Sequence, residues 1–168
     1  MPTSDPQEIP FSGVRLRFDS AKGFSELVAA LLARVGETPV PIDDIGAKFP
    51  TWESYEREVQ SHVGPSGFML FAQWDHGAWI NKAGIDRQVL RVVIGNPLIA
   101  ITMLRHDVTA GLFAPVELLL TEEAGGRSAL TYVVPSSLMV VEPNRPLLEA
   151  ANELDVKLAA LAAAATAS

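Results

Sequence analysis

Four short apolar segments follow one another through the middle of the chain, and their order constrains the fold more than any other feature. They lie at 68–74, 89–94, 115–121 and 128–134, and their β-branched and aromatic content is typical of strands. The last two are separated by a link that contains Gly125 and Gly126, which predicts a hairpin. Consecutive strands flanked by helices predict an α+β fold built on an antiparallel sheet.

The segments on either side of these strands supply a fifth strand and two helices. Residues 13–19 alternate between apolar and charged side chains, which is typical of a half-buried strand. Apolar residues then recur every three or four positions over 21–35, with Ser20 as the expected N-cap, and again from Leu147 to Leu161. We expect both long helices to pack on one face of the sheet. Pro135, Pro143 and Pro146 predict a loop before the last helix.

The chain is expected to form one domain with an arm and an insertion. Residues 1–12 contain three prolines and predict a flexible N-terminal arm, and residues 13–168 predict a single α+β domain. Within that domain, residues 36–64 form an insertion. Its first part is interrupted by prolines, and Thr51 is the expected cap of a helix in its second part.

The charge balance and the absence of cysteine exclude several classes of protein. Thirteen Lys and Arg residues stand against twenty Asp and Glu residues, a net charge of −7, so a phosphate-backbone binder is not expected and no nucleic-acid partner is predicted. With no cysteine there is no disulfide, thiolate metal site or thiol nucleophile. No signal sequence and no apolar run of about 18–20 residues is present, so we expect a cytoplasmic protein with no membrane partner.

Several motifs in order resemble one known family. The segments are GFMLFAQWDHGAWINKAGI (67–85), VLRVVIGNPL (89–98), APVELLL (114–120) and LTYVVP (130–135), and Gly-Asn-Pro is the most recognisable tripeptide among them. Over roughly residues 13–143 the chain resembles the family of domain of unknown function 302. The resemblance implies a TATA-box-binding-protein-like order of strand, helix, four strands and helix, and small dimers without an established common activity. The longer link at 36–64 and the apolar Leu98 and Ile99 depart from the family's pattern.

The dipeptide Asp75-His76 is the first candidate for a functional site. It lies where a strand is expected to leave the sheet, and histidine acts as an acid, a base or a ligand. One hypothesis is therefore an enzyme that uses His76 as general acid/base, oriented by Asp75 or Glu117. The alternative is structural: Asp75 caps the following short helix, and His76 satisfies a carbonyl group in the turn.

A haem or metal bound through His76 is a further hypothesis. His62, His76 and His106 lie far apart and lack the spacing of a metal motif, so no metal ligand is assigned and the cofactor is left unknown. Glu117 or Asp86 would have to meet His76 in space to complete a metal site.

Trp79 and Asn96 complete the candidate ligand-binding residues, which are Asp75, His76, Trp79, Asn96 and Glu117. Trp79 and the other aromatic residues of this region either line a groove or pack the insertion onto the sheet. Asn96 and Pro97 begin a helix whose free N–H groups either bind an anion or are capped by Asn96 itself.

The face of the sheet that carries Glu117 is expected to be partly apolar, because Met69, Phe71, Val93 and Leu119 are assigned to it. An apolar outer face favours a covering partner, most simply a second copy of the chain. We therefore expect a homodimeric module that binds a small ligand or a protein.

Overall fold

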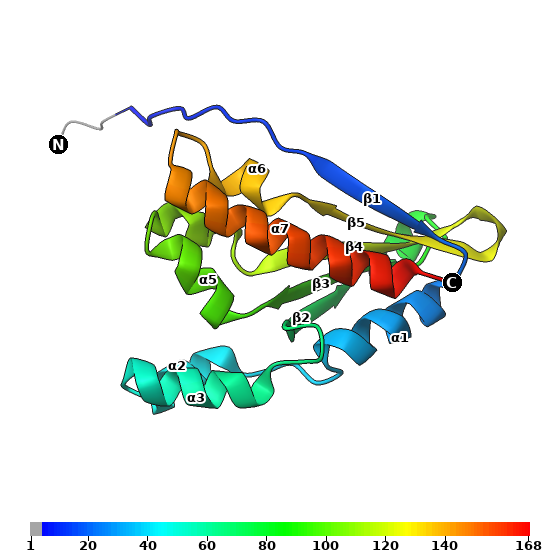
Figure 1. Ribbon diagram of the computed structural model, residues 1–168. Helices are drawn as coiled ribbons and strands as arrows, with labels where there is room; N and C mark the ends of the chain where they lie inside the picture. The colour runs from blue at the N-terminus through cyan, green and yellow to red at the C-terminus, as the bar shows by residue number, and fades with distance from the viewer. Residues whose placement is uncertain (1–4) are drawn as a thin grey trace.

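The computed structural model describes residues 5–168, and its centre is one five-stranded sheet (Figure 1). All neighbouring strands are antiparallel, in the order β1-β5-β4-β3-β2. Their bounds are β1 Arg15–Ser20, β2 Met69–Asp75, β3 Val89–Gly95, β4 Val116–Glu123 and β5 Arg127–Val133. The expected mixed fold of helices and one antiparallel sheet is confirmed.

Two long helices, α1 and α7, pack side by side on the same face of this sheet. The helices are α1 Phe24–Val35, α2 Ile42–Lys48, α3 Trp52–His62, α4 Gly77–Ile80, α5 Pro97–Leu104, α6 Pro135–Met139 and α7 Arg145–Thr166; the 3-10 turns are η1 Asn81–Ala83, η2 Val108–Phe113 and η3 Ala124–Gly126. No helix among the described residues is long and apolar enough to cross a membrane.

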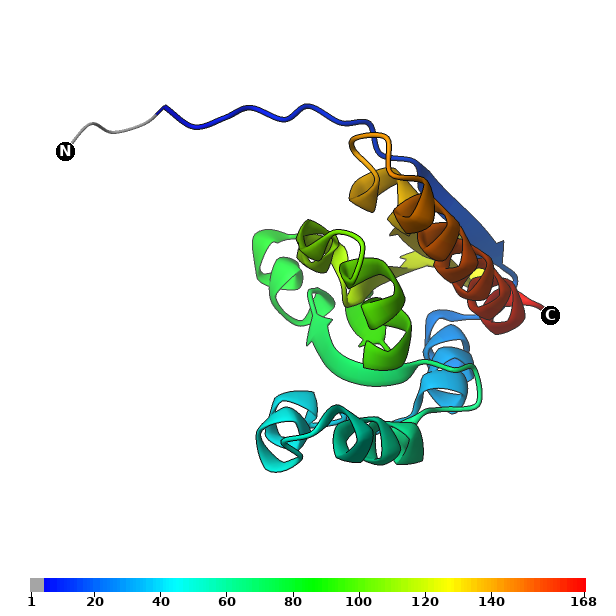
Figure 2. The same cartoon turned by 60° about the vertical axis from the view of Figure 1, so that its left-hand side comes forward.

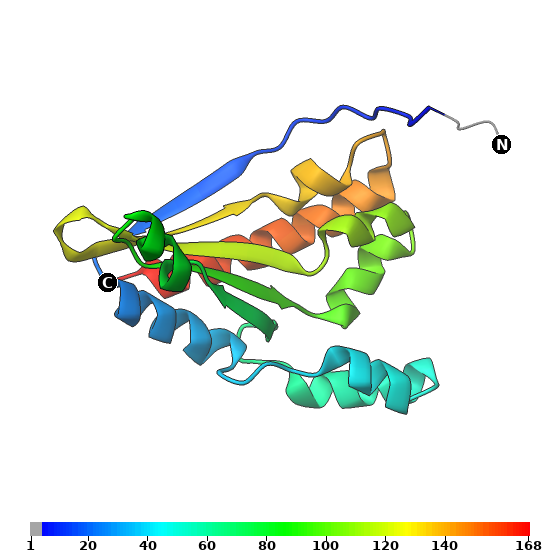
Figure 3. The same cartoon turned by 180° about the vertical axis from the view of Figure 1, so that it is seen from behind.

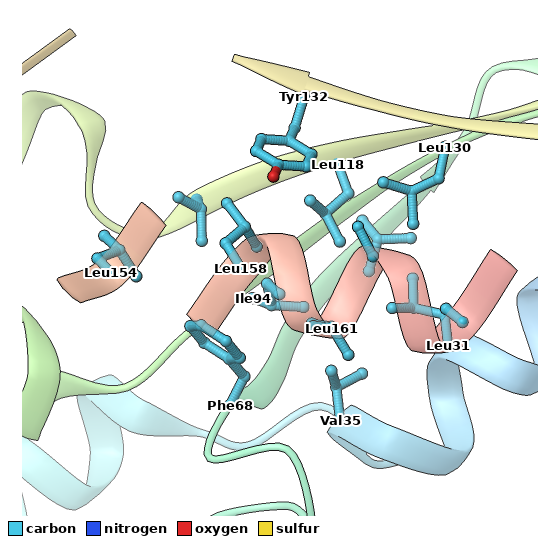
Figure 4. Packing of buried hydrophobic residues seen from close by; sticks show 14 of the residues in the cluster. Leu31, Val35, Phe68, Ile94, Leu118, Leu130, Tyr132, Leu154, Leu158 and Leu161 are labelled. Atoms are coloured by element: carbon cyan, nitrogen blue, oxygen red, sulfur yellow. The ribbon is translucent and has the colours of Figure 1, made fainter. Parts of the chain in front are cut away.

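The core lies between the sheet and the two long helices (Figure 4). Alternate strand residues such as Ile94, Leu118 and Leu130 point toward Leu31 of α1 and Leu158 of α7, and all five are fully shielded from solvent or nearly so. This is the arrangement that a period of two in strands and of three to four in helices requires. Tyr132 also lies in this core, where burial first and the charge of Asp155 second raise the pKa of its hydroxyl.

Three predicted boundaries need correction. Ser20 is the last residue of β1 and not a helix cap; its hydroxyl donates to the carbonyl oxygen of Thr166, which joins β1 to the end of α7. Pro135 and Pro146 lie in the first turns of α6 and α7 and not in a loop, because a first turn does not use the N–H that proline lacks.

Gly125 and Gly126 adopt φ of 74° and 71° in the predicted hairpin.

Strand β2 lies at an edge of the sheet, although a strand with apolar residues on both faces is typical of a central position. The assignment of its side chains to faces is wrong beyond Leu70. The pairing with β3 shifts between Leu70 and Ala72, and this irregularity moves Ala72 and Trp74 to the face that carries Met69. Periodicity alone cannot reveal such a shift, because one additional residue exchanges the two faces.

The insertion explains why both sides of β2 are apolar. Helices α2 and α3 lie against one another beside the start of β2 (Figure 2), and Ile45 and Val59 form a second buried cluster with Met69. Phe71 packs against the same cluster. These two residues of β2 are therefore covered by this chain itself, and the expectation that they belong to an open apolar face is wrong.

Candidate functional site

Asp75, His76 and Trp79 lie together around the first turn of α4. The Asp75 carboxylate accepts a hydrogen bond from the N–H of Ala78 at 3.1 Å, so it caps this turn. His76 Nδ1 and Trp79 Nε1 are 3.3 Å apart, and the two rings meet edge to face with centroids 6.0 Å apart. The indole donates in this hydrogen bond, because its nitrogen is a donor only.

A cavity of about 470 Å³ lies on one side of this turn, between it and α1. Asp75 is among its lining residues, which are Phe24, Ser25, Val28, Asp75, Gly77, Ala78, Asn81, Asp86, Arg87, Gln88 and Leu90. His76 and Trp79 do not line it, although acid–base catalysis by His76 requires a pocket in which its ring contacts a substrate. The role of His76 as general acid or base, or as a haem ligand, therefore stays a prediction.

Both polar atoms of the Asn96 side-chain amide form hydrogen bonds within the chain. Its Oδ1 accepts a hydrogen bond from the N–H of Leu98, and its Nδ2 donates to the carbonyl oxygen of Gly67; both distances are 2.9 Å. The first bond caps α5, and the second joins that helix to the loop before β2. The local signal of Asn before Pro thus marks a helix start, as the capping interpretation stated.

Glu117 lies apart from the other candidates. It is opposite Val93 in the β3–β4 pairing, on the face of the sheet away from the long helices, and it forms an ion pair with Arg91. Asp75 is opposite Leu90, three positions further along β3, and this odd spacing directs it to the other face. Glu117 is consequently not brought to Asp75, and it lies in a different site.

That site is a groove of about 780 Å³ across the face of the sheet opposite α7, the face seen in Figure 3. We call it the arginine groove, because four of its lining residues are arginines; the lining is Arg15, Arg17, Arg87, Arg91, Leu112, Phe113, Pro115, Val116, Glu117, Leu118, Leu119, Thr121, Glu123, Thr131, Tyr132, Val133, Pro135 and Leu138. Its arginines come from β1 on one side and from β3 and the loop before it on the other, and its apolar rim comes from η2 and α6.

Three carboxylates pair with three of the arginines, and the shortest contact of Arg17 is to Asp19 at 2.8 Å. Glu123 accepts hydrogen bonds from Arg87 at 2.6 Å and from Arg17 at 3.4 Å, while Arg91 pairs with Glu117 and lies 5.2 Å from the centre of the Trp74 ring. The hydroxyl of Thr121 is the main cause that lowers the pKa of Glu123, and the two arginines add to it. Hydrogen bonds to Asp19 and then to Glu123 raise the pKa of Arg17.

Arg15 differs from the other three arginines. Among residues 5–168 it has no ion pair and no side-chain hydrogen bond. The groove has four arginines against two glutamates, an excess of two positive charges in a chain whose net charge is −7. This concentration of positive charge favours an anionic occupant.

The sequence contains a signal for the arginine groove that none of its motifs shows. Arg15 and Arg17 alternate with Val14, Leu16 and Phe18, so they share one face of a strand. Arg91 lies within an otherwise apolar strand, where a charged residue indicates an exposed face. Only the order of the strands shows that these arginines line one groove.

Across the described part of the chain, no three His, Asp or Glu side chains gather as a metal site would require.

Comparison with known proteins places the chain among uncharacterised domains. The family model described as "Domain of unknown function DUF302" matches residues 47–165. A solved structure, described as that of an uncharacterized conserved protein DUF302 from Bacillus stearothermophilus, is similar with a TM-score of 0.63 and 19% sequence identity, covering 90% of this chain and 97% of the other. At this identity the likeness shows the fold. No curated protein matches the chain.

Proposed function

The chain belongs to the DUF302 family, and on that premise we propose that it is a homodimeric module that binds a small organic anion in the arginine groove. The observation that carries the proposal is the groove itself, a cavity of about 780 Å³ with an excess of arginine over glutamate. A cavity of this size is within the range of small-molecule sites.

The chemistry of the lining favours a carboxylate with an apolar body. Arginine binds planar anions through paired N–H groups, and Arg15 is free to do so without breaking an ion pair within the described residues. The neighbouring floor and rim contain Leu119, Val133 and Phe113, which an aliphatic chain would cover. Each methylene group buried there would add at most about 0.8 kcal/mol to the free energy of binding.

The dimensions of the floor also support a ligand of several carbons. In the strand register, Arg17 is opposite Thr131, Thr131 opposite Leu119, and Leu119 opposite Arg91. Three strand spacings therefore separate the two arginines of this row, or about 14 Å. A fatty or aromatic acid fits between them more readily than an ion as small as acetate.

The homodimer and the finer fold assignment belong to the same proposal. A second copy against η2 would shield Val108 and Leu112, which are 77% and 80% exposed, and this supports a symmetric pair. The strand order β1-β5-β4-β3-β2, with α1 and α7 on one face, supports the TATA-box-binding-protein-like arrangement. A cytoplasmic location is part of the same proposal.

Isothermal titration with straight-chain carboxylates from butyrate to decanoate tests the anion site. We expect affinity to rise with chain length and to fall about tenfold in Arg15→Gln, which corresponds to about 1.4 kcal/mol. Arg57→Gln is the matched control, because Arg57 is an exposed arginine of α3 whose one ion pair among residues 5–168 is with Glu53. Absence of binding at millimolar concentration, or equal affinities of both variants, would contradict the proposal.

A further inference from the structure

The described part of the N-terminal arm, residues 5–12, is the strongest candidate for a partner of the arginine groove. Every residue of this arm is exposed, including Ile9 at 56% and Phe11 at 51%. The arm leaves the body of the protein in all three views (Figures 1, 2 and 3). We propose that the arm of each copy occupies the arginine groove of a second copy. This inference rests on the groove of the proposed function.

The charges of the arm and the groove are complementary. The arm contains Asp5 and Glu8 and no basic residue, whereas the groove has two more arginines than glutamates. Pro6 and Pro10 favour a polyproline II conformation, which has three residues per turn. In that conformation Asp5, Glu8 and Phe11 lie along one edge of the arm, about 9 Å apart in succession. The free part of this edge thus presents two carboxylates, as a site of arginines requires, while Phe11 stays on Phe113 of its own chain.

The anchoring of the arm favours the groove of another molecule over its own. The N–H of Val14 donates to Ser137 Oγ at 3.0 Å, and the carbonyl oxygen of Val14 accepts from the N–H of Val134 at 2.7 Å. Phe11 packs edge to face on Phe113 at the rim, with ring centroids 6.0 Å apart. These contacts hold the base of the arm, and from there the chain runs outward, away from the sheet (Figure 3).

The free part of the arm is long enough for this exchange. Residues 5–10 extend about 19 Å in the polyproline II conformation, compared with about 14 Å between Arg17 and Arg91 across the floor. Two copies related by a twofold axis would place both arms reciprocally, which closes the assembly as a dimer. The arm then competes with any anionic ligand for the groove.

A peptide-binding experiment tests the exchange directly. The protein lacking residues 1–12 is titrated into a fluorescein-labelled peptide of residues 1–12, and fluorescence anisotropy is measured at 50 and 300 mM NaCl. We expect the affinity for the peptide to fall as the salt concentration rises. The truncated Arg15→Glu variant should bind the peptide at least tenfold more weakly, and the truncated Arg57→Glu variant should bind it with unchanged affinity. A peptide with Glu8→Arg should recover affinity for Arg15→Glu. Equal binding to all variants, or none, overturns the inference.

Sedimentation of the full chain gives a second readout that does not depend on truncation. The Asp5→Asn/Glu8→Gln variant keeps the length of the arm, and we expect its dimer to dissociate at least tenfold more readily than the wild-type dimer. An unchanged dissociation constant overturns the inference.

Titration of decanoate into the truncated protein separates this inference from the proposed function. Decanoate binding without peptide binding would contradict the arm exchange and leave the proposed anion site standing. Peptide binding without decanoate binding removes the small-anion proposal alone.

Discussion

Met69→Ala tests the finding that the insertion, and not a second molecule, covers the outer side of β2. Met69 is fully buried between β2 and the α2–α3 pair. The substitution removes three heavy atoms beyond Cβ. At about 0.8 kcal/mol each they account for about 2.4 kcal/mol of transfer free energy, and the cavity that remains brings the expected loss of stability to about 3 kcal/mol. For a chain of this size the midpoint of thermal unfolding should fall by about 6–12 °C.

Urea denaturation followed by circular dichroism measures this loss at a protein concentration where the variant is monomeric. Val108→Ala is the control, because Val108 is an apolar residue of η2 that is 77% exposed, and its loss should stay within about 0.5 kcal/mol. We expect a single unfolding transition, because Met69 joins the insertion to the sheet. The dependence of the free energy of unfolding on urea concentration should be unchanged. A loss below about 0.5 kcal/mol for Met69→Ala, or two separate transitions in the wild type, would refute the reasoning.

Two further predictions concern Glu123 and Asn96. Because the pKa of Glu123 is lowered in the folded protein, its contribution to stability is complete above the ordinary value of 4.5 and is lost as the pH falls through the lower folded value. Urea denaturation between about pH 5 and pH 3 should therefore show a steeper loss of stability in the wild type than in Glu123→Gln, and parallel curves would contradict this. The free energy of unfolding should fall by about 2 kcal/mol in Asn96→Ala, because this variant removes both the cap of α5 and the donor to the Gly67 carbonyl. Asn96→Ser retains a cap, and its free energy of unfolding should fall by about half as much. Equal stability of the two Asn96 variants in urea would show that the cap of α5 contributes nothing, and a stability of Asn96→Ser equal to that of the wild type would show that the bond to Gly67 contributes nothing.

Local chemistry explains which parts of the candidate site were predictable. Asp75 and Asn96 lie at helix starts, where the identity of one residue and its immediate neighbours decides the hydrogen bond. The arginine groove was not predicted, because Arg15 and Arg91 are 76 positions apart in sequence and lie in the same groove only through the strand pairing. The same reason applies to Glu117: register places it on the face of the sheet opposite Asp75, and its use by His76 stays a prediction.

The sequence by itself determined which segments become strands and helices, since alternation, three- and four-residue spacing and capping residues act within a few positions. It therefore also determined that the fold combines helices with an antiparallel sheet. Only the tertiary structure decided that β2 lies at an edge, that a shift after Leu70 exchanges its faces, and that the insertion covers Met69. These features depend on contacts between segments distant in the chain, and a pairing register can change by one residue without leaving a trace in the local pattern.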